Sequence, residues 1–184
     1  HHFGRRVDAC GDILMDRYER IRNGFNALLD ANRGCQVKQL DVADRFLSME
    51  LSGLLDSIRS RVDCHFGLSY AYVDGFFFVI PEDEAIGPSF KMGGCEPLQM
   101  RAMWNCLRHG DTVVDVGASV GLYTVVAGRA VGPGGAVIAM EPDPFSAAIL
   151  EENARLNGLC NVRVVNCAAG RSGGKCFLYL SDRN

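Results

Sequence analysis

Apolar side chains recur every three or four residues along two stretches in the first third of the chain, which is the spacing of one helical face. Over residues 11–30 these positions are Leu14, Tyr18, Ile21, Phe25 and Leu28. In the second stretch they are Leu40, Ala43, Leu47, Leu51, Leu54 and Ile58. The pattern predicts two helices joined by a turn at Gly34. Because two heptads are too few to indicate a coiled coil, we expect this hairpin to pack on the rest of the chain.

The pattern changes between residues 66 and 92, where aromatic and β-branched residues dominate. Tyr70 and Tyr72 precede the apolar run Phe76–Ile80, and Asp74-Gly75 lies between them. Asp-Gly between two apolar runs is a hairpin signal. Small antiparallel strands are therefore predicted here.

A regular alternation of helical and strand patterns follows. The predicted elements are a helix over 97–108, a buried strand over 113–116, a helix over 121–131, a buried strand over 136–140, a helix over 144–157, a buried strand over 162–165 and a further strand over 175–180. Asp143 and Gly158 suit the N-cap and the end of the helix over 144–157. The order strand–helix–strand–helix–strand predicts an α/β fold with a parallel sheet and right-handed crossovers.

Composition adds bounds to this picture. The 184 residues, 48% hydrophobic and 22% charged, suit one globular domain over residues 63–184 preceded by a helical extension over residues 1–62. Because 19 basic residues face 22 acidic ones and no basic arm stands out, we expect no nucleic-acid partner. No apolar run approaches the roughly 20 residues of a membrane span, so no membrane partner is expected either.

The eight cysteines include no C-x-x-C pair, which argues against a zinc ribbon or a redox dithiol. We expect free thiols, mostly packed as small apolar residues, in a reducing compartment such as the cytoplasm. No metal-ligand spacing is present, and no metal site is predicted.

The stretch VVDVGASVGLYT, residues 113–124, carries the candidate chemistry. In a parallel sheet, ligands bind beyond the carboxyl ends of the strands. Gly117 allows a tight turn and a close ligand approach because it lacks a Cβ atom. Gly121 begins the next helix, where a side chain would hold that helix and the preceding strand apart. The free N–H groups at that helix start attract an anion.

Acidic residues at the predicted strand ends indicate which ligand this is. Glu141 lies 24 residues after Gly117, the place of a carboxylate that holds ribose hydroxyls. Ser119 replaces the middle glycine of a dinucleotide motif, and Asp115 would repel a pyrophosphate but attract an ammonium group. These features favour S-adenosylmethionine and disfavour NAD.

The segments DVGASVGLYT, IAMEPDP and VVNCAAG resemble class I S-adenosylmethionine-dependent methyltransferases. More narrowly they resemble the FkbM type, whose pattern "G-x-x-E … D-V-G-A-N-x-G-x-Y-T" matches Gly93–Glu96 and Asp115–Thr124 with Ser119 in place of the asparagine. The resemblance covers about residues 66–180. It implies a Rossmann-like methyltransferase sheet.

The resemblance also implies a set of cofactor-binding residues. Asp115 to Gly121 would line the methionine end, Glu141 the ribose, residues 142–143 and 166–168 the adenine, and Glu96 the mouth of the site. The full set is Glu96, Asp115, Gly117, Ala118, Ser119, Gly121, Glu141, Pro142, Asp143, Asn166, Cys167 and Ala168.

Each of these residues has a plain structural alternative. Asp115 could cap a neighbouring helix, Glu141 could be a solvated strand end, Glu96 could favour the dipole of the following helix, and Cys167 could be a small packed residue. Tyr123 is assigned to the core.

The implied reaction is O-methylation, with a hydroxyl on a small molecule or a glycan as the acceptor. The family's acidic stretch beyond the third strand, commonly Asp-x-Glu-Gly, is not found, so catalytic residues are not assigned and a truncated chain is expected. Its first strand would then form an exposed edge of the sheet. An oligomer is left open. The alternatives are a nucleotide-binding module without catalysis, a decayed methyltransferase fragment and, less favoured, an NAD-dependent oxidoreductase.

Overall fold

The computed structural model describes residues 55, 56, 58–61, 67–73, 75–82, 96–175 and 177–179, together with Asn23, Ala27 and Ser52. Contacts divide the chain into two compact units, His1–Leu54 and Leu55–Asn184. Asn23, Ala27 and Ser52 are helical, as are the described residues between 55 and 61. The rest of the predicted helical hairpin lies outside the described residues. The proposed division into domains after residue 62 stays a prediction.

The predicted β-hairpin is confirmed in the second unit. Strands β1 (Leu68–Val73) and β2 (Phe76–Pro81) pair antiparallel, with Val73 opposite Phe76. Gly75 lies in the turn with φ 89°, a conformation that favours glycine. Every residue of β2 after Phe76 is buried, which explains why this strand reads as a continuous apolar run.

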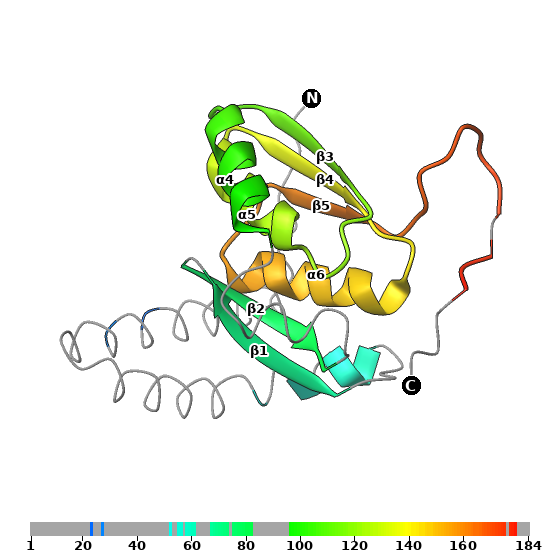
Figure 1. Cartoon of the computed structure of the whole chain (residues 1–184). Coiled ribbons are helices and arrows are strands. Elements are labelled where there is room, and N and C mark those ends of the chain that lie inside the picture. Colours follow the sequence, from blue (N-terminus) through cyan, green and yellow to red (C-terminus); the bar gives the residue numbers. More distant parts are fainter. Residues whose placement is uncertain are drawn as a thin grey trace, which may run out of the picture. The chain divides into compact units, whose positions relative to one another are not determined.

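The alternating pattern after residue 96 forms one three-stranded sheet with its helices (Figure 1). The elements are α4 (Pro97–Cys106), β3 (Thr112–Val116), α5 (Leu122–Val131), β4 (Ala136–Met140), α6 (Pro144–Leu156) and β5 (Val162–Val165). The strands are parallel in the order β3-β4-β5, with Val113 opposite Val137 and Val137 opposite Val162. The predicted α/β fold class, a Rossmann-like parallel sheet with a small antiparallel region, is confirmed.

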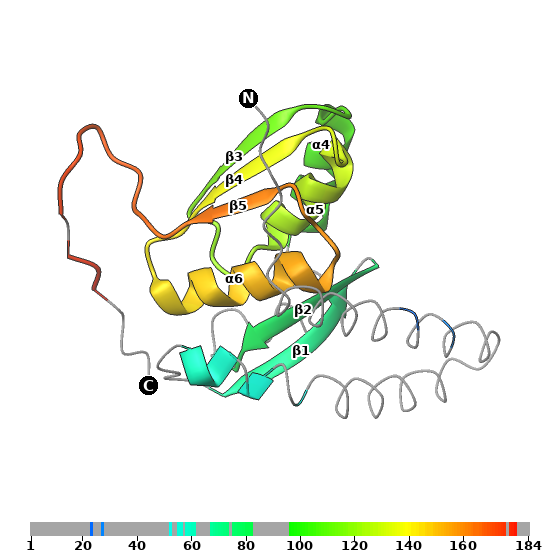
Figure 2. The same ribbon diagram turned by 180° about the vertical axis from the view of Figure 1, so that it is seen from behind.

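Helices α5 and α6 cover the same face of the sheet. Ala127 and Val131 of α5 pack against Val137 of β4, and Leu150 of α6 packs against Ala139 two residues along β4. Residues two apart on a strand point to the same face, so both helices lie on that side. Figures 1 and 2 show α6 between the three-stranded sheet and the hairpin, in agreement with its contacts to β2 and β5.

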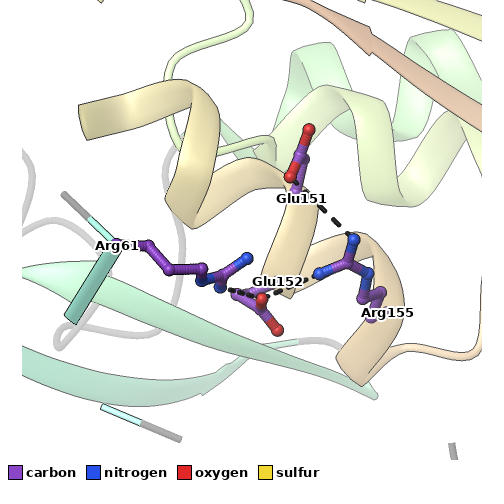
Figure 3. Close-up of polar contacts among 4 residues, drawn as sticks. All are labelled: Arg61, Glu151, Glu152 and Arg155. Carbon is purple, nitrogen blue, oxygen red and sulfur yellow. Dashed lines mark hydrogen bonds and ion pairs between the residues drawn. The ribbon is translucent and has the colours of Figure 1, made fainter. Parts of the chain in front are cut away.

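A charged cluster joins α6 to the helical residues that precede the hairpin (Figure 3). The side chain of Glu152 is 3% exposed, and its Oε1 accepts hydrogen bonds from Arg61 and, at 2.9 Å, from Arg155. Arg155 also lies 4.0 Å from Glu151. A buried carboxylate is tolerated because arginine donors compensate for its lost hydration.

The opposite face of the sheet corrects one expectation. The predicted buried strand over 113–116 is half exposed, because Val114 and Val116 are 56% and 60% accessible. Parallel strands are normally covered on both faces. Among the described residues, helices cover only the face that carries Val113 and Asp115. The predicted edge position of this strand, β3, is confirmed within that part of the chain.

Expectations about the C-terminal segment and the cysteines also need correction. The strand predicted over 175–180 is wrong for its described residues, Lys175 and 177–179, which are outside any strand. Cys106, Cys160 and Cys167 are free thiols, but the first two are exposed rather than packed. No helix in the described part of the chain is long and apolar enough to cross a membrane.

Candidate functional site

The residues predicted to bind a cofactor gather at the carboxyl ends of the three parallel strands. The turn 117–121 follows β3 and leads into α5, Glu141 follows β4, and Asn166 follows β5. This edge is where open α/β sheets bind ligands, because the strand ends and helix starts leave backbone groups without partners in the sheet.

Two glycines shape the turn for different reasons. Gly117 has φ 77°, and a Cβ atom built on it meets no other atom within 4 Å. Gly121 has φ 93°, and its built Cβ would lie 2.9 Å from Cγ of Leu150. The first glycine leaves open space beside the backbone, whereas the second lets α6 approach the turn closely. From the sequence we expected a side chain at residue 121 to collide with the preceding strand, but the structure shows that it would collide with Leu150 of α6.

Ser119 is held in a left-handed conformation, φ 50°, which is uncommon for residues other than glycine, asparagine and aspartate. Its N–H donates to Oε2 of Glu141 at 2.7 Å. The FkbM-type pattern has asparagine at this position. Asparagine adopts the left-handed conformation more readily than serine, so serine makes the backbone conformation of the turn less favourable.

Glu141 is 7% exposed and ties two segments together. Its Oε2 accepts from Ser119, and its Oε1 accepts from the N–H of Asp143 at 2.9 Å. It is therefore not a solvated strand end. Because each carboxylate oxygen has two lone pairs, both oxygens keep capacity for one further donor such as a ribose hydroxyl.

Asp115 lies in β3 and is half buried. Its Oδ2 accepts a hydrogen bond of 2.6 Å from the hydroxyl of Thr124, which is fully buried in α5. The bond fixes the carboxylate beside the first turn of α5. Sequence reasoning did not single out Thr124 as a site residue, because a threonine inside an apolar helix start gives no signal of its partner.

Glu96 precedes α4 with φ 55° and accepts a hydrogen bond from the hydroxyl of Tyr123 in α5. The contact brings Glu96 to the first turn of α5, close in sequence to the glycine turn. Tyr123 is half buried rather than a core residue, and its role as a partner of Glu96 was missed. The sequence signal that could have identified Tyr123 as a site residue is its position two residues after Gly121.

The residues after β4 and β5 mainly organise the loop. Asp143 caps α6 as predicted, accepting from the N–H groups of Phe145 and Ser146 at 3.3 and 2.9 Å. Nδ2 of Asn166 donates to the carbonyls of Glu141 and Pro142 at 2.8 and 3.0 Å. These bonds hold together the segments that the resemblance assigns to the adenine.

The remaining predicted residues differ in exposure. Cys167 is half buried and Ala168 is exposed, whereas Ala118 is 6% exposed and packs with Ala139 and Leu150 in the core. The side chain of Ala118 therefore belongs to the core, and only its backbone lies in the turn. No cluster of three or more potential metal ligands occurs among the residues that the structure describes.

No protein-family model matches this sequence, and no curated protein matches it. Solved structures do match. The M. jannaschii TYW2 structure in complex with AdoMet shares 22% identity at a TM-score of 0.43, over 53% of this chain and 42% of its own. A putative rRNA-methylase from Clostridium thermocellum shares 21% at 0.38, over 39% of each chain. The complex of aTrm5 with tRNALeu shares 16% at 0.42, over 54% of this chain and 28% of its own.

One of these similar structures is a putative methylase by name, and another is a complex with AdoMet. The chain spans between 28% and 42% of the length of the three proteins. The TYW2 structure is a complex with AdoMet, which is the cofactor that the sequence predicts for this chain. The narrower resemblance to FkbM-type enzymes stays a prediction.

One expectation about partners is wrong. The charge balance led us to exclude a nucleic-acid partner, yet the similar structures include an rRNA-methylase and a complex with tRNALeu. Net charge sums over the whole chain and does not report how one site recognises an RNA. The exclusion is therefore withdrawn.

Proposed function

We propose that the turn 117–121 and Glu141 form an S-adenosylmethionine site and that the protein acts as a methyltransferase. The observation that carries the proposal is the bridge from Ser119 through the buried Glu141 carboxylate to Asp143. It fixes an acidic group at the end of β4, beside the glycine turn that ends β3.

The chemistry of the residues present fits this cofactor. Asp115 suits an ammonium group, the N–H groups at the start of α5 suit a carboxylate, and Glu141 suits the two hydroxyls of a ribose. The open space beside Gly117 admits a ligand that a Cβ atom would obstruct. When bound, the cofactor supplies a methyl group attached to a sulfonium. The protein holds and orients it, and orients the acceptor.

The resemblance to FkbM-type enzymes supports a narrower form of the proposal, O-methylation of a hydroxyl. Sugars, small molecules and RNA all carry hydroxyls, so the acceptor is a question for assay. We assign no catalytic base, because among the described residues none is tied by geometry to an acceptor.

A calorimetric titration with S-adenosylhomocysteine tests the site. We expect saturable binding that Glu141→Ala weakens by about 10- to 100-fold, because hydrogen bonds to a charged group contribute about 1.5–3 kcal/mol. Glu151→Ala is the control, since it removes a carboxylate of α6 that is 45% exposed. A parallel titration with NAD should show no binding.

Two results would contradict the site assignment. One is a folded chain that does not bind S-adenosylhomocysteine, and the other is an equal effect of the two substitutions. Transfer of labelled methyl from S-adenosylmethionine to a panel of hydroxyl compounds that includes RNA then tests the activity. Binding without transfer to any of them would favour a nucleotide-binding module over an enzyme.

A further inference from the structure

Two buried asparagines, Asn153 in α6 and Asn157 at its C-cap, make nearly the same contacts with the hairpin. Asn153 is fully buried and Asn157 is 8% exposed. Oδ1 of Asn153 accepts from the N–H of Val79 at 2.7 Å, and its Nδ2 donates to the carbonyl of Val79 at 2.9 Å. Asn157 makes the same pair of bonds with Phe77, at 3.0 and 2.7 Å. Each side chain thus pairs with one residue of β2 as a neighbouring strand would.

The two asparagines differ in their third hydrogen bond. The second donor of Asn157 bonds at 2.8 Å to the carbonyl of Asn153, in the last turn of α6. The second donor of Asn153 bonds at 2.8 Å to the carbonyl of Val120, in the glycine turn. Asn153 therefore joins three segments that are distant in sequence, namely α6, β2 and the turn 117–121.

The carbonyl of Val120 belongs to the peptide unit that it shares with the N–H of Gly121. That N–H donates to the carbonyl of Ala118 at 2.9 Å and closes the turn. Because a peptide unit is planar, a bond that fixes the Val120 carbonyl also fixes the direction of the Gly121 N–H. The other side of the turn is held by β4, where the N–H groups of Gly117 and Ala118 donate to the carbonyl of Met140.

We infer that Asn153 is a positioning residue for the cofactor turn and couples the β1–β2 hairpin to it. The inference rests on the proposed function for the role of the turn, but the coupling is made by hydrogen bonds within the chain and does not depend on a ligand. Without the Asn153 side chain, the Val120–Gly121 peptide loses its tie to α6, and the turn samples orientations that do not fit a ligand. Asn153 touches neither cofactor nor acceptor in this proposal and acts through Val120.

Asn153→Ala and Asn157→Ala form a matched pair in the full chain. Each removes one asparagine that bonds to β2, so both should lower the melting temperature by similar amounts. Only Asn153→Ala should raise amide hydrogen exchange at Ser119, Val120 and Gly121, by about tenfold, the effect of one lost hydrogen bond of roughly 1 kcal/mol. It should also weaken S-adenosylhomocysteine binding by about tenfold, with Asn157→Ala within about twofold of the unmodified chain.

Equal effects of the two substitutions on the turn amides would overturn the inference, because Asn153 would then act only as a clamp on β2. If Asn153→Ala does not fold, NMR of the unmodified chain decides. The inference requires a through-bond coupling between Nδ2 of Asn153 and the Val120 carbonyl carbon, and its absence would contradict the inference. Failure of the unmodified chain to bind S-adenosylhomocysteine would instead overturn the proposed function, while the exchange data would still judge the coupling.

Discussion

Two constraints favour glycine at residue 121, the positive φ of the backbone and the close approach of Leu150, and substitutions can distinguish their costs. The φ of 93° at Gly121 disfavours any side chain, and a Cβ atom would lie 2.9 Å from Leu150. We expect Gly121→Ala to lower the free energy of unfolding by about 2–4 kcal/mol, the sum of the backbone strain and of overpacking against α6. Urea unfolding monitored by circular dichroism measures it.

Gly110→Ala is the control for this prediction. Gly110 has φ 91°, but a Cβ atom there meets nothing within 4 Å. We expect a loss of about 1 kcal/mol from backbone strain alone. If the two substitutions cost the same, the contact between Gly121 and Leu150 does not limit the packing of α6.

Sequence reasoning found most positions in the site but few of the partners. Gly117, Gly121 and Glu141 were predicted because glycines and acidic residues at strand ends have local signatures. The bond from Ser119 to Glu141 and the contact between Tyr123 and Glu96 join residues more than twenty positions apart. Such pairings depend on how the elements pack, which one sequence does not reveal.

At the scale of the element, α6 depends on its cap. Asp143 accepts from the N–H groups of Phe145 and Ser146 and from the hydroxyl of Ser146. We expect Asp143→Ala to cost about 1 kcal/mol of stability, the usual effect of losing an N-cap. Thermal unfolding measures it, and Glu151→Ala on the same helix should change stability by less than about 0.5 kcal/mol. An equal effect of the two would contradict a capping role.

The contact between α6 and the helical residues before the hairpin gives a second prediction at this scale. Glu152 is buried and bonded to Arg61 (Figure 3), so Arg61→Ala removes a charge-assisted bond from a dehydrated carboxylate. We expect a loss of about 1–3 kcal/mol in urea unfolding. Arg155 remains bonded to Glu152 and limits the loss.

Arg59 offers the matched control for Arg61. It forms an ion pair with Asp56 in the same helical stretch, but both side chains are well exposed, at 46% and 74%. Arg59→Ala should cost less than about 0.5 kcal/mol, because water screens such pairs. A loss as large as that of Arg61→Ala would show that burial of Glu152 is not what makes its contact strong.

The elements with caps and regular periodicity were predicted within a few residues of their observed bounds. For α6, Asp143 and Gly158 mark both ends, and Gly158 has the expected positive φ of 68°. The strand expected over 175–180 shows the limit of the method. Apolar and aromatic residues favour a strand, but a strand exists only where a neighbour pairs with it, and Phe177 and Tyr179 are about 90% exposed.

At the scale of the whole second unit, the described helices cover one face of the sheet β3-β4-β5 and leave the other face open. Val137 is fully buried on the covered face, whereas Val114 is 56% exposed on the other. We expect Val137→Thr to cost about 1–3 kcal/mol, since a hydroxyl is buried there, and Val114→Thr to change stability by less than about 0.5 kcal/mol. Urea unfolding compares the two, and similar losses would mean that the open face is covered in solution.

The parallel sheet followed from the order of elements, because a strand–helix–strand unit with right-handed crossovers allows few arrangements. The exposure of the second face did not follow, since β3 carries valines on both faces, Val113 on one and Val114 and Val116 on the other. The expectation about nucleic acid failed for a related reason. A sum over the chain carries no information about the place of each charge.

The asparagine pair at the C-terminal end of α6, Asn153 and its C-cap Asn157, has a consequence for changes in chain length. Four helical residues rise about 6 Å and two strand residues span about 6.5 Å, so Asn153 and Asn157 match Val79 and Phe77 over one repeat. A single insertion between the asparagines would rotate one of them by about 100° and break the match. The next residue of β2 in this series is Pro81, which has no N–H and so could not form the same pair of hydrogen bonds. Insertions and deletions should therefore be tolerated in the exposed residues 170–174 but not between Asn153 and Asn157 at the end of α6.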